Sequence, residues 1–231
     1  MKKENLDFEI NNDKFVYEKS LKNPTNSFIN KVKFVDMYLN RPVASLVVRA
    51  VFNTPVTPNG LTYISFIIGI LGAFSFSRGN PMYFILGGIC AQLSSIIDGA
   101  DGMLARAKNM CSNYGSHLDL FLDRILDFSL LVGISLGASI HFKNPNLLFL
   151  GLLTAGLYLL QVNLFYLTKS YLQKKDKGDT GEARAVLILC MLIFAIAGCL
   201  DIFIYLFLIE VALNNIIRLL FFIKLGMEKN L

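Results

Sequence analysis

Four aspartates fall within one short stretch of the chain, at intervals that helices would bring together. The stretch DGADGMLARAKNMCSNYGSHLDLFLD covers residues 98–123. On a helix, Asp98 and Asp101 share one face because they are three residues apart, and Asp119 and Asp123 share a face because they are four apart. If the polar residues between the pairs turn the chain, two antiparallel helices bring all of these carboxylates to one place.

Carboxylates this close need a counter-charge, because several neighbouring anions cannot all stay ionised. Hard oxygen ligands select Mg²⁺, Mn²⁺ or Ca²⁺ over zinc. Two metal ions held by shared carboxylates are a known arrangement for displacement at phosphorus. Gly102 and Gly115 leave room for a bulky group such as a nucleotide, and Arg106 offers a planar fork to a phosphate. The spacing therefore predicts a metal-dependent site for phosphoryl chemistry.

Two other interpretations of the aspartates stay open. A salt-bridged helix hairpin would need basic partners, and the nearby ones are Arg106, Lys108 and Arg124. A non-enzymatic transporter with a divalent-cation site would be expected to show inverted repeats or a pair of interrupted membrane helices, and neither pattern is found. A Mg²⁺-dependent phosphoryl-transfer activity separates an enzyme from both.

The composition predicts an all-α membrane protein. Of the 231 residues, 54% are hydrophobic and 17% charged, against about 45–50% and about 25% in soluble domains. The apolar residues gather in long runs without the alternation of barrel strands. We expect six transmembrane helices, centred on Leu61–Phe76, Met82–Ile97, Leu118–Ile140, Leu147–Leu167, Ala185–Leu200 and Ile202–Phe222. Some runs are short for a bilayer, so their helices should continue into polar flanks.

The segment before the first predicted span divides into two parts. Residues 1–26 are polar and are expected to form a cytoplasmic arm, and residues 27–57 are expected to form an amphipathic helix at the membrane interface, before a six-helix domain at 58–231. Phe28, Val32 and Val35 recur at helical spacing in this segment. Pro42 suits a first helical position, with Asn40 or Arg41 as the cap.

The distribution of basic residues predicts the orientation. Lys and Arg concentrate before the first span, in the second and fourth connections and in the tail, whereas the opposite side has Arg78 and Lys143. Both termini and the aspartate stretch should therefore face the cytoplasm. A formal net charge of +5 fits attraction to anionic lipid. No nucleic-acid partner is expected, because a compact basic and aromatic module is missing from the sequence.

The aspartate stretch resembles the signature of the CDP-alcohol phosphotransferase family, also called CDP-alcohol phosphatidyltransferases of class I. The matching positions are Asp98, Asp101, Gly102, Ala105, Arg106, Gly115, Asp119 and Asp123. The resemblance implies a CDP-alcohol donor bound near two Mg²⁺ or Mn²⁺ ions, attack by an acceptor hydroxyl on the phosphorus that bears the alcohol, and release of CMP.

The resemblance also implies roles for individual residues. The first three aspartates are expected to be metal ligands, and Asp123 to be a ligand and the general base. The segment TPNGLT would place Asn59 and Thr62 near the nucleotide, with Gly102, Ala105, Arg106 and Gly115. Homodimers are common in the family.

The acceptor must be selected by residues outside the signature. Arg184 opens the fifth predicted span, and Arg218 lies in the sixth with Glu210 and Asn214 on one stripe. Charges inside a membrane face a cavity or the protein interior, so two arginines favour a phosphorylated acceptor, such as inositol phosphate or glycerol phosphate. The alternatives are polar contacts between helices with a snorkelling Arg184, and an unphosphorylated acceptor such as serine, ethanolamine or choline.

A finer resemblance concerns the segments AQLSSIIDGADG and LDRILD. They are similar to the branch that makes di-myo-inositol phosphate phosphate from CDP-inositol and inositol phosphate. Asp127 matches that branch, whereas Met103 stands where the branch has Glu. A member that makes an anionic phospholipid from CDP-diacylglycerol and a phosphorylated alcohol is at least as good an alternative.

Overall fold

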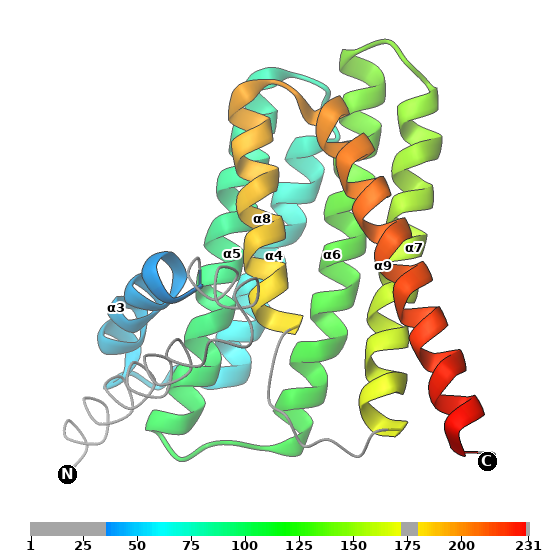
Figure 1. The fold of residues 1–231 in the computed structure, drawn as a ribbon. Helices are drawn as coiled ribbons and strands as arrows, with labels where there is room; N and C mark the ends of the chain where they lie inside the picture. Colours follow the sequence, from blue (N-terminus) through cyan, green and yellow to red (C-terminus); the bar gives the residue numbers. More distant parts are fainter. Residues whose placement is uncertain (1–35, 172–179, 230–231) are drawn as a thin grey trace.

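The chain folds into helices that pack as an elongated bundle (Figure 1). The computed structural model describes residues 36–171 and 180–229, and this part of the chain contains helices and connections without strands. The all-helical prediction is therefore confirmed. A π-helical turn, η1 (Asp36–Asn40), precedes α3 (Arg41–Val51), and the bundle follows: α4 (Pro58–Phe76), α5 (Pro81–Ala107), α6 (Asn113–His141), α7 (Asn146–Tyr171), α8 (Thr180–Ala197) and α9 (Leu200–Lys229).

Four of the described helices are long and apolar enough to cross a membrane. They are Pro58–Phe76, Pro81–Ala107, Asn146–Thr168 and Leu200–Ile223, and Arg184–Ala197 forms a shorter apolar helix. Large apolar side chains such as Leu71 and Leu220 are exposed on their outer faces. The helices α5 and α6 run past the predicted apolar cores, to Ala107 and from Asn113, as expected for short runs that continue into polar flanks.

Two helix starts near the aspartates are fixed by capping side chains. The Thr57 hydroxyl accepts from Gly60 N at 3.2 Å, with Pro58 next to it in the first turn of α4. The Ser112 hydroxyl accepts from Gly115 N at 3.0 Å at the start of α6. Such caps contribute about 0.5–2 kcal/mol each, and they set where α4 and α6 begin beside the C-terminal end of α5.

Close backbone approach places α4 between α5 and α6. A Cβ atom built on Gly133 would lie 2.3 Å from Ala73 O, and one on Gly72 would lie 3.0 Å from Gly87 O, so larger residues would push the helices apart. Each of α5 and α6 contacts α4 far more than they contact each other. The two aspartate-bearing helices therefore meet near their connected ends, where the signature residues lie.

The helix α3 is tied to α5 by a buried amide. Asn40 is 2% exposed, its Oδ1 accepts from Gln92 Nε2 at 2.7 Å, and its Nδ2 donates to Ser95 Oγ at 3.4 Å. Asn40 occupies the predicted cap position but makes no side-chain cap bond, because its amide turns into the bundle. Ala44 and Val48 are buried, whereas Leu46 is exposed. The rest of the predicted interfacial helix before residue 36, and the 1–26 arm, lie outside the described residues.

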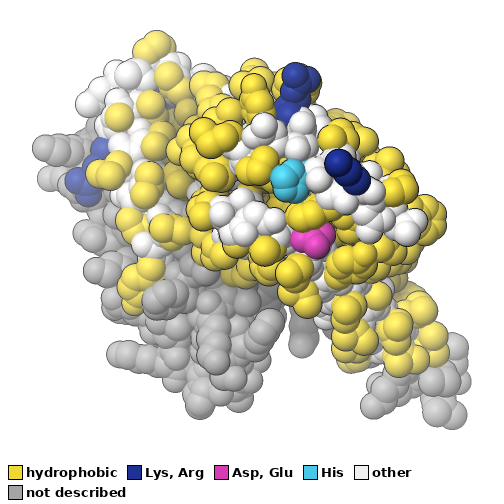
Figure 2. All heavy atoms as spheres, turned by 90° about the horizontal axis from the view of Figure 1, so that it is seen from above, with side chains coloured by type: hydrophobic (Ala, Val, Ile, Leu, Met, Phe, Trp, Pro, Cys, Tyr) yellow, Lys and Arg dark blue, Asp and Glu magenta, His cyan; other side chains and the backbone are white. Residues whose placement is uncertain are grey.

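The end of the bundle away from the aspartates is largely apolar. Figure 2 looks onto this end and shows mainly hydrophobic side chains with few charged ones. The connections at this end include the positive-φ residues Gly79 and Gly198. Among the described residues, the signature aspartates therefore lie at the opposite end of the bundle.

Candidate active site

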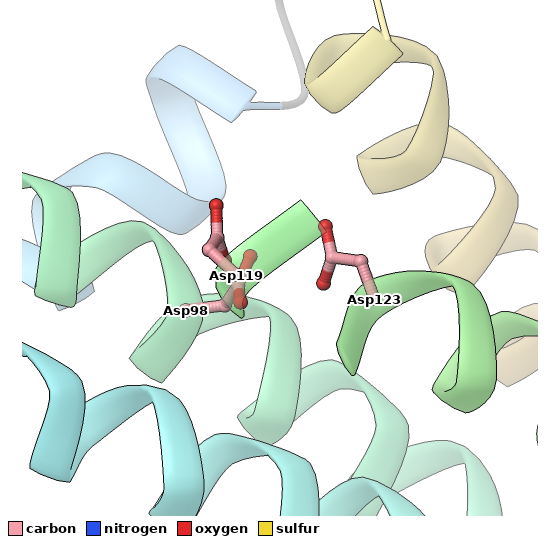
Figure 3. Close-up of side chains that lie close together, drawn as sticks. All are labelled: Asp98, Asp119 and Asp123. Atoms are coloured by element: carbon pink, nitrogen blue, oxygen red, sulfur yellow. The ribbon is translucent and has the colours of Figure 1, made fainter. Parts of the chain in front are cut away.

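Three of the signature aspartates converge between α5 and α6. Asp98 comes from the C-terminal half of α5, and Asp119 and Asp123 from the first turns of α6. Each offers one carboxylate oxygen, and these oxygens all lie within 4.8 Å of one another (Figure 3). The helical spacing predicted that the aspartates lie close together, and the structure shows this for Asp98, Asp119 and Asp123.

Asp101 is held by a residue of α4. Thr62 Oγ1 donates to Asp101 Oδ2 and lies 3.2 Å from Pro58 O. Both side chains are buried, at 4% exposure for Thr62 and 8% for Asp101. The TPNGLT segment therefore reaches the aspartates directly, through a hydrogen bond to a carboxylate.

A cavity of about 260 Å³ opens beside Asp101 and Asp119. Gly115 is in its wall, and a Cβ atom built there would lie 2.9 Å from Asn59 Oδ1 and 3.1 Å from Ser112 Oγ. With a larger residue at this position, the Asn59 side chain or this turn of α6 would have to shift. All of the residues predicted to contact the nucleotide line this cavity: Asn59, Thr62, Gly102, Ala105, Arg106 and Gly115.

Arg184 supplies the aspartates with a counter-charge from a distant part of the sequence. Its side chain is 4% exposed, and Nη1 lies 3.1 Å from Asp98 Oδ2 and 2.7 Å from Asp123 Oδ1. Arg184 is not among the basic residues close in sequence to the aspartate stretch, so it was not predicted as their partner. Arg184 stands out in the sequence because it begins an apolar run. Only the packing of α8 shows which carboxylates it contacts.

Asp127 is a further buried carboxylate that the signature does not include. It is 2% exposed and accepts from Arg184 Nε at 2.8 Å. Arg124 Nη1 lies 3.2 Å from its Oδ2, and the Tyr158 hydroxyl donates to the same oxygen at 3.2 Å. In the sequence, Asp127 stands out only through the resemblance to one branch of the family, whereas in the structure it is paired with Arg184.

Arg218 lies elsewhere in the bundle. Its guanidinium carbon is 5.0 Å from the centre of the Phe165 ring on α7, and on the same face of α9 Asn214 Nδ2 donates to Glu210. Among the described residues, none of the ion pairs of the aspartate cluster includes Arg218. The structure thus brings Arg184 to the aspartates and places Arg218 in a separate polar stripe.

The aspartate cluster fits a divalent cation. Its donors are carboxylate oxygens, which suit Mg²⁺ and Mn²⁺. Asp119 Oδ1 is buried and has no hydrogen-bond partner among the described residues, which leaves an anionic oxygen that a cation would satisfy.

Membrane-capable helices and a carboxylate cluster that fits a divalent cation, beside a cavity, define a helical membrane protein with a candidate metal site. The comparison with protein families is more specific, because residues 55–217 match the family described as CDP-alcohol phosphatidyltransferase. The chain belongs to this family, whose members are enzymes that transfer substituted phosphate groups.

The relatives with similar sequences include named synthases and transferases. The archaetidylinositol phosphate synthase of Pyrococcus horikoshii is 38% identical over 96 residues, which are 42% of this chain and 50% of that protein. The bifunctional IPC transferase and DIPP synthase of Thermococcus kodakarensis is 42% identical over 98 residues, which are 42% of this chain and 22% of that protein. The matched segments thus span half or less of these relatives.

Solved structures share the fold. The crystal structure of the Mycobacterium tuberculosis phosphatidylinositol phosphate synthase with CDP-DAG bound has a TM-score of 0.64 at 17% identity, over 77% of this chain and 92% of that chain. The same synthase in complex with manganese and citrate also has a TM-score of 0.64 at 17% identity, over 76% and 87% of the two chains.

Proposed function

We propose that the protein is an integral membrane transferase that moves a substituted phosphate group from a CDP-alcohol to an alcohol acceptor and releases CMP. The observation that carries this proposal is the cavity next to Asp101 and Asp119, which all of the predicted nucleotide contacts line. The donor is of the CDP-diacylglycerol or CDP-inositol type, and its nucleotide and diphosphate occupy this cavity. Arg106 in the wall can offer two parallel N–H donors to the diphosphate.

The residues that would hold two Mg²⁺ or Mn²⁺ ions are Asp98, Asp101, Asp119 and Asp123. When bound, such ions neutralise the diphosphate and stabilise charge that develops at the reacting phosphorus. Thr62 orients Asp101 through its hydroxyl. Since groups that orient metal ligands affect affinity strongly, Thr62 belongs to the same functional unit.

Asp123 is the proposed general base. It takes the proton of the acceptor hydroxyl while a bond forms between the acceptor oxygen and the phosphorus that bears the alcohol. The bond from that phosphorus to CMP breaks, and CMP leaves with the electron pair. Asp123 Oδ1 is engaged by Arg184 at 2.7 Å, whereas Oδ2 is 4.0 Å from Arg124, so we assign the proton to Oδ2.

The acceptor that we propose is a phosphorylated polyol of the inositol phosphate kind. Arg184 Nη2 is buried without a hydrogen-bond partner among the described residues, and an anionic phosphate would supply one. The names of the related proteins point to the same class of acceptor. Arg218, whose guanidinium lies over the Phe165 ring, is a second proposed contact.

The membrane arrangement is also a proposal. We infer six spans, α4 to α9, with both termini and the aspartates on the cytoplasmic side, α3 at the interface, and a homodimer as the assembly. The apolar surface of the bundle and the sparse charge at the far end (Figure 2) support this orientation.

The experiment that tests the function is a substrate screen with purified protein in detergent. CDP-diacylglycerol and CDP-inositol are each offered inositol phosphate, glycerol phosphate, serine and inositol, with and without Mg²⁺, and CMP and product masses are measured. We expect Mg²⁺-dependent CMP release with a phosphorylated acceptor. Arg218→Gln should raise the KM for that acceptor but not for the donor. The proposed reaction is wrong if no donor yields CMP, and a product formed only with serine or inositol would overturn the acceptor class.

A further inference from the structure

Asp127 is a buried carboxylate whose neighbours come from three helices. Arg124 is on its own helix α6, Tyr158 is on α7 and Arg184 is on α8, and all three contact its carboxylate oxygens. At 2% exposure, a carboxylate needs such partners, because burial of an unpaired charge is costly. Asp127 therefore connects the proposed active site to the helices that surround it.

The contact with Asp127 fixes one edge of the Arg184 guanidinium. Nε lies 2.8 Å from Asp127 Oδ1, and Nη1 of the same planar group lies 3.1 Å from Asp98 and 2.7 Å from Asp123. Because a guanidinium is rigid and planar, holding Nε determines where Nη1 stands. Asp127 thus sets the position of a cation between two of the carboxylates that fit a metal ion.

A fixed cation beside a cation-binding site opposes the binding of metal, because like charges at such distances repel strongly at low dielectric. The Asp127 carboxylate, which contacts Arg184 Nε, offsets that charge. We infer that Asp127 is a positioning residue, which fixes the Arg184 guanidinium and partly neutralises its charge, and thereby raises the affinity of Asp98, Asp119 and Asp123 for a divalent cation. This inference rests on the proposed function.

The test is a set of binding measurements with Mn²⁺ on the full chain in detergent. The variants are Asp127→Asn, Arg184→Gln and the double variant. The matched control is Asp201→Asn, the same chemical change in the first turn of α9, at the end of the bundle away from the aspartates. Dissociation constants come from calorimetric or electron-spin titration, and thermal unfolding in the absence of Mn²⁺ checks that each variant is folded.

We expect Asp127→Asn to weaken Mn²⁺ binding by about 10–100-fold, the range found for groups that orient metal ligands. In the Arg184→Gln background the same change should have an effect of about threefold or less, because coupled residues are non-additive.

The other possible results of these titrations contradict either the inference or the proposed function. If Asp127→Asn binds Mn²⁺ like the wild type, or if its effect is the same in both backgrounds, Asp127 does not act through Arg184. If Asp127→Asn fails to fold, the comparison of Arg184→Gln with the double variant still decides the matter, because a large loss between those two would overturn the inference. If the wild type itself neither binds Mn²⁺ nor releases CMP, the proposed function has failed instead.

Discussion

Arg184 on α8 and Asp123 on α6 form an ion pair with 2.7 Å between Nη1 and Oδ1. The aspartate that we assign as general base is therefore held by an arginine from a helix that is distant in sequence. This contact engages one carboxylate oxygen, and in the proposed mechanism the other oxygen takes the proton. The pair ties the position of the base to the packing of α8 on the bundle.

Asp123→Asn should abolish turnover, because an amide cannot take the proton of the acceptor. Loss of a general base costs about 100–10,000-fold in rate. Binding of the CDP-alcohol should persist, since Asp123 is outside the cavity lining. CMP release and calorimetric binding of the donor measure the two effects, with Asp201→Asn as the control. Wild-type turnover in Asp123→Asn would remove the assignment of the base.

Gly115→Ala should impair the donor site. The added Cβ would stand 2.9 Å from Asn59 Oδ1, so α6 or Asn59 must shift. We expect kcat/KM for the CDP-alcohol to fall by up to about 100-fold, because small misplacements of groups in an active site can cause losses of that size. Gly156→Ala on α7 is the matched control, because nothing lies within 4 Å of its added Cβ. Equal efficiency in the two variants would show that the close approach is not needed.

Thr62→Val should weaken the metal site while it keeps the shape of the side chain. The change removes the hydroxyl that donates to Asp101, and we expect Mn²⁺ affinity to fall by about 10–100-fold. Thr62→Ser retains the donor and should remain near the wild type. Mn²⁺ titration of the three proteins provides the measurement, and a valine variant with wild-type affinity would contradict the role of the hydrogen bond.

Removal of divalent metal should stop the reaction and lower the melting temperature. A metal ion that binds only the folded protein stabilises it by about 2.7 kcal/mol at a concentration 100 times its Kd. We therefore expect EDTA to abolish CMP release and added Mn²⁺ to raise the melting temperature. Asp119→Asn should reduce that rise, because its buried oxygen lacks a protein partner among the described residues. A melting temperature insensitive to Mn²⁺ would argue against a metal at these aspartates.

Substitution of Asn40 should loosen α3. Asn40→Ala removes a bond from Gln92 and one to Ser95, and a buried donor or acceptor left unpaired costs about 1–3 kcal/mol. Thermal unfolding in detergent measures the loss. Ser45→Ala is the control, because the Ser45 hydroxyl bonds locally to Pro42 O on an exposed face. A melting temperature for Asn40→Ala equal to that of the control would show that the buried amide is unimportant.

The sequence by itself determined the helical class and the location of the aspartate pairs. In a membrane only helices and closed barrels satisfy the backbone, and long apolar runs without strand alternation therefore indicate helices. The spacing from Asp98 to Asp123 follows helical periodicity, so it is visible without a structure. The cavity-lining residues also followed, because Asn59 and Gly115 belong to short segments with recognisable patterns.

Only the tertiary structure decided how the site is charged and where each arginine acts. Arg184 and Asp127 are brought together by the packing of α8 against the bundle, and no local spacing encodes that contact. The same holds for Asn40, which looked like a helix cap but turns inward to Gln92. Periodicity fixes which residues share a face of one helix, whereas the faces that meet depend on how all the helices pack.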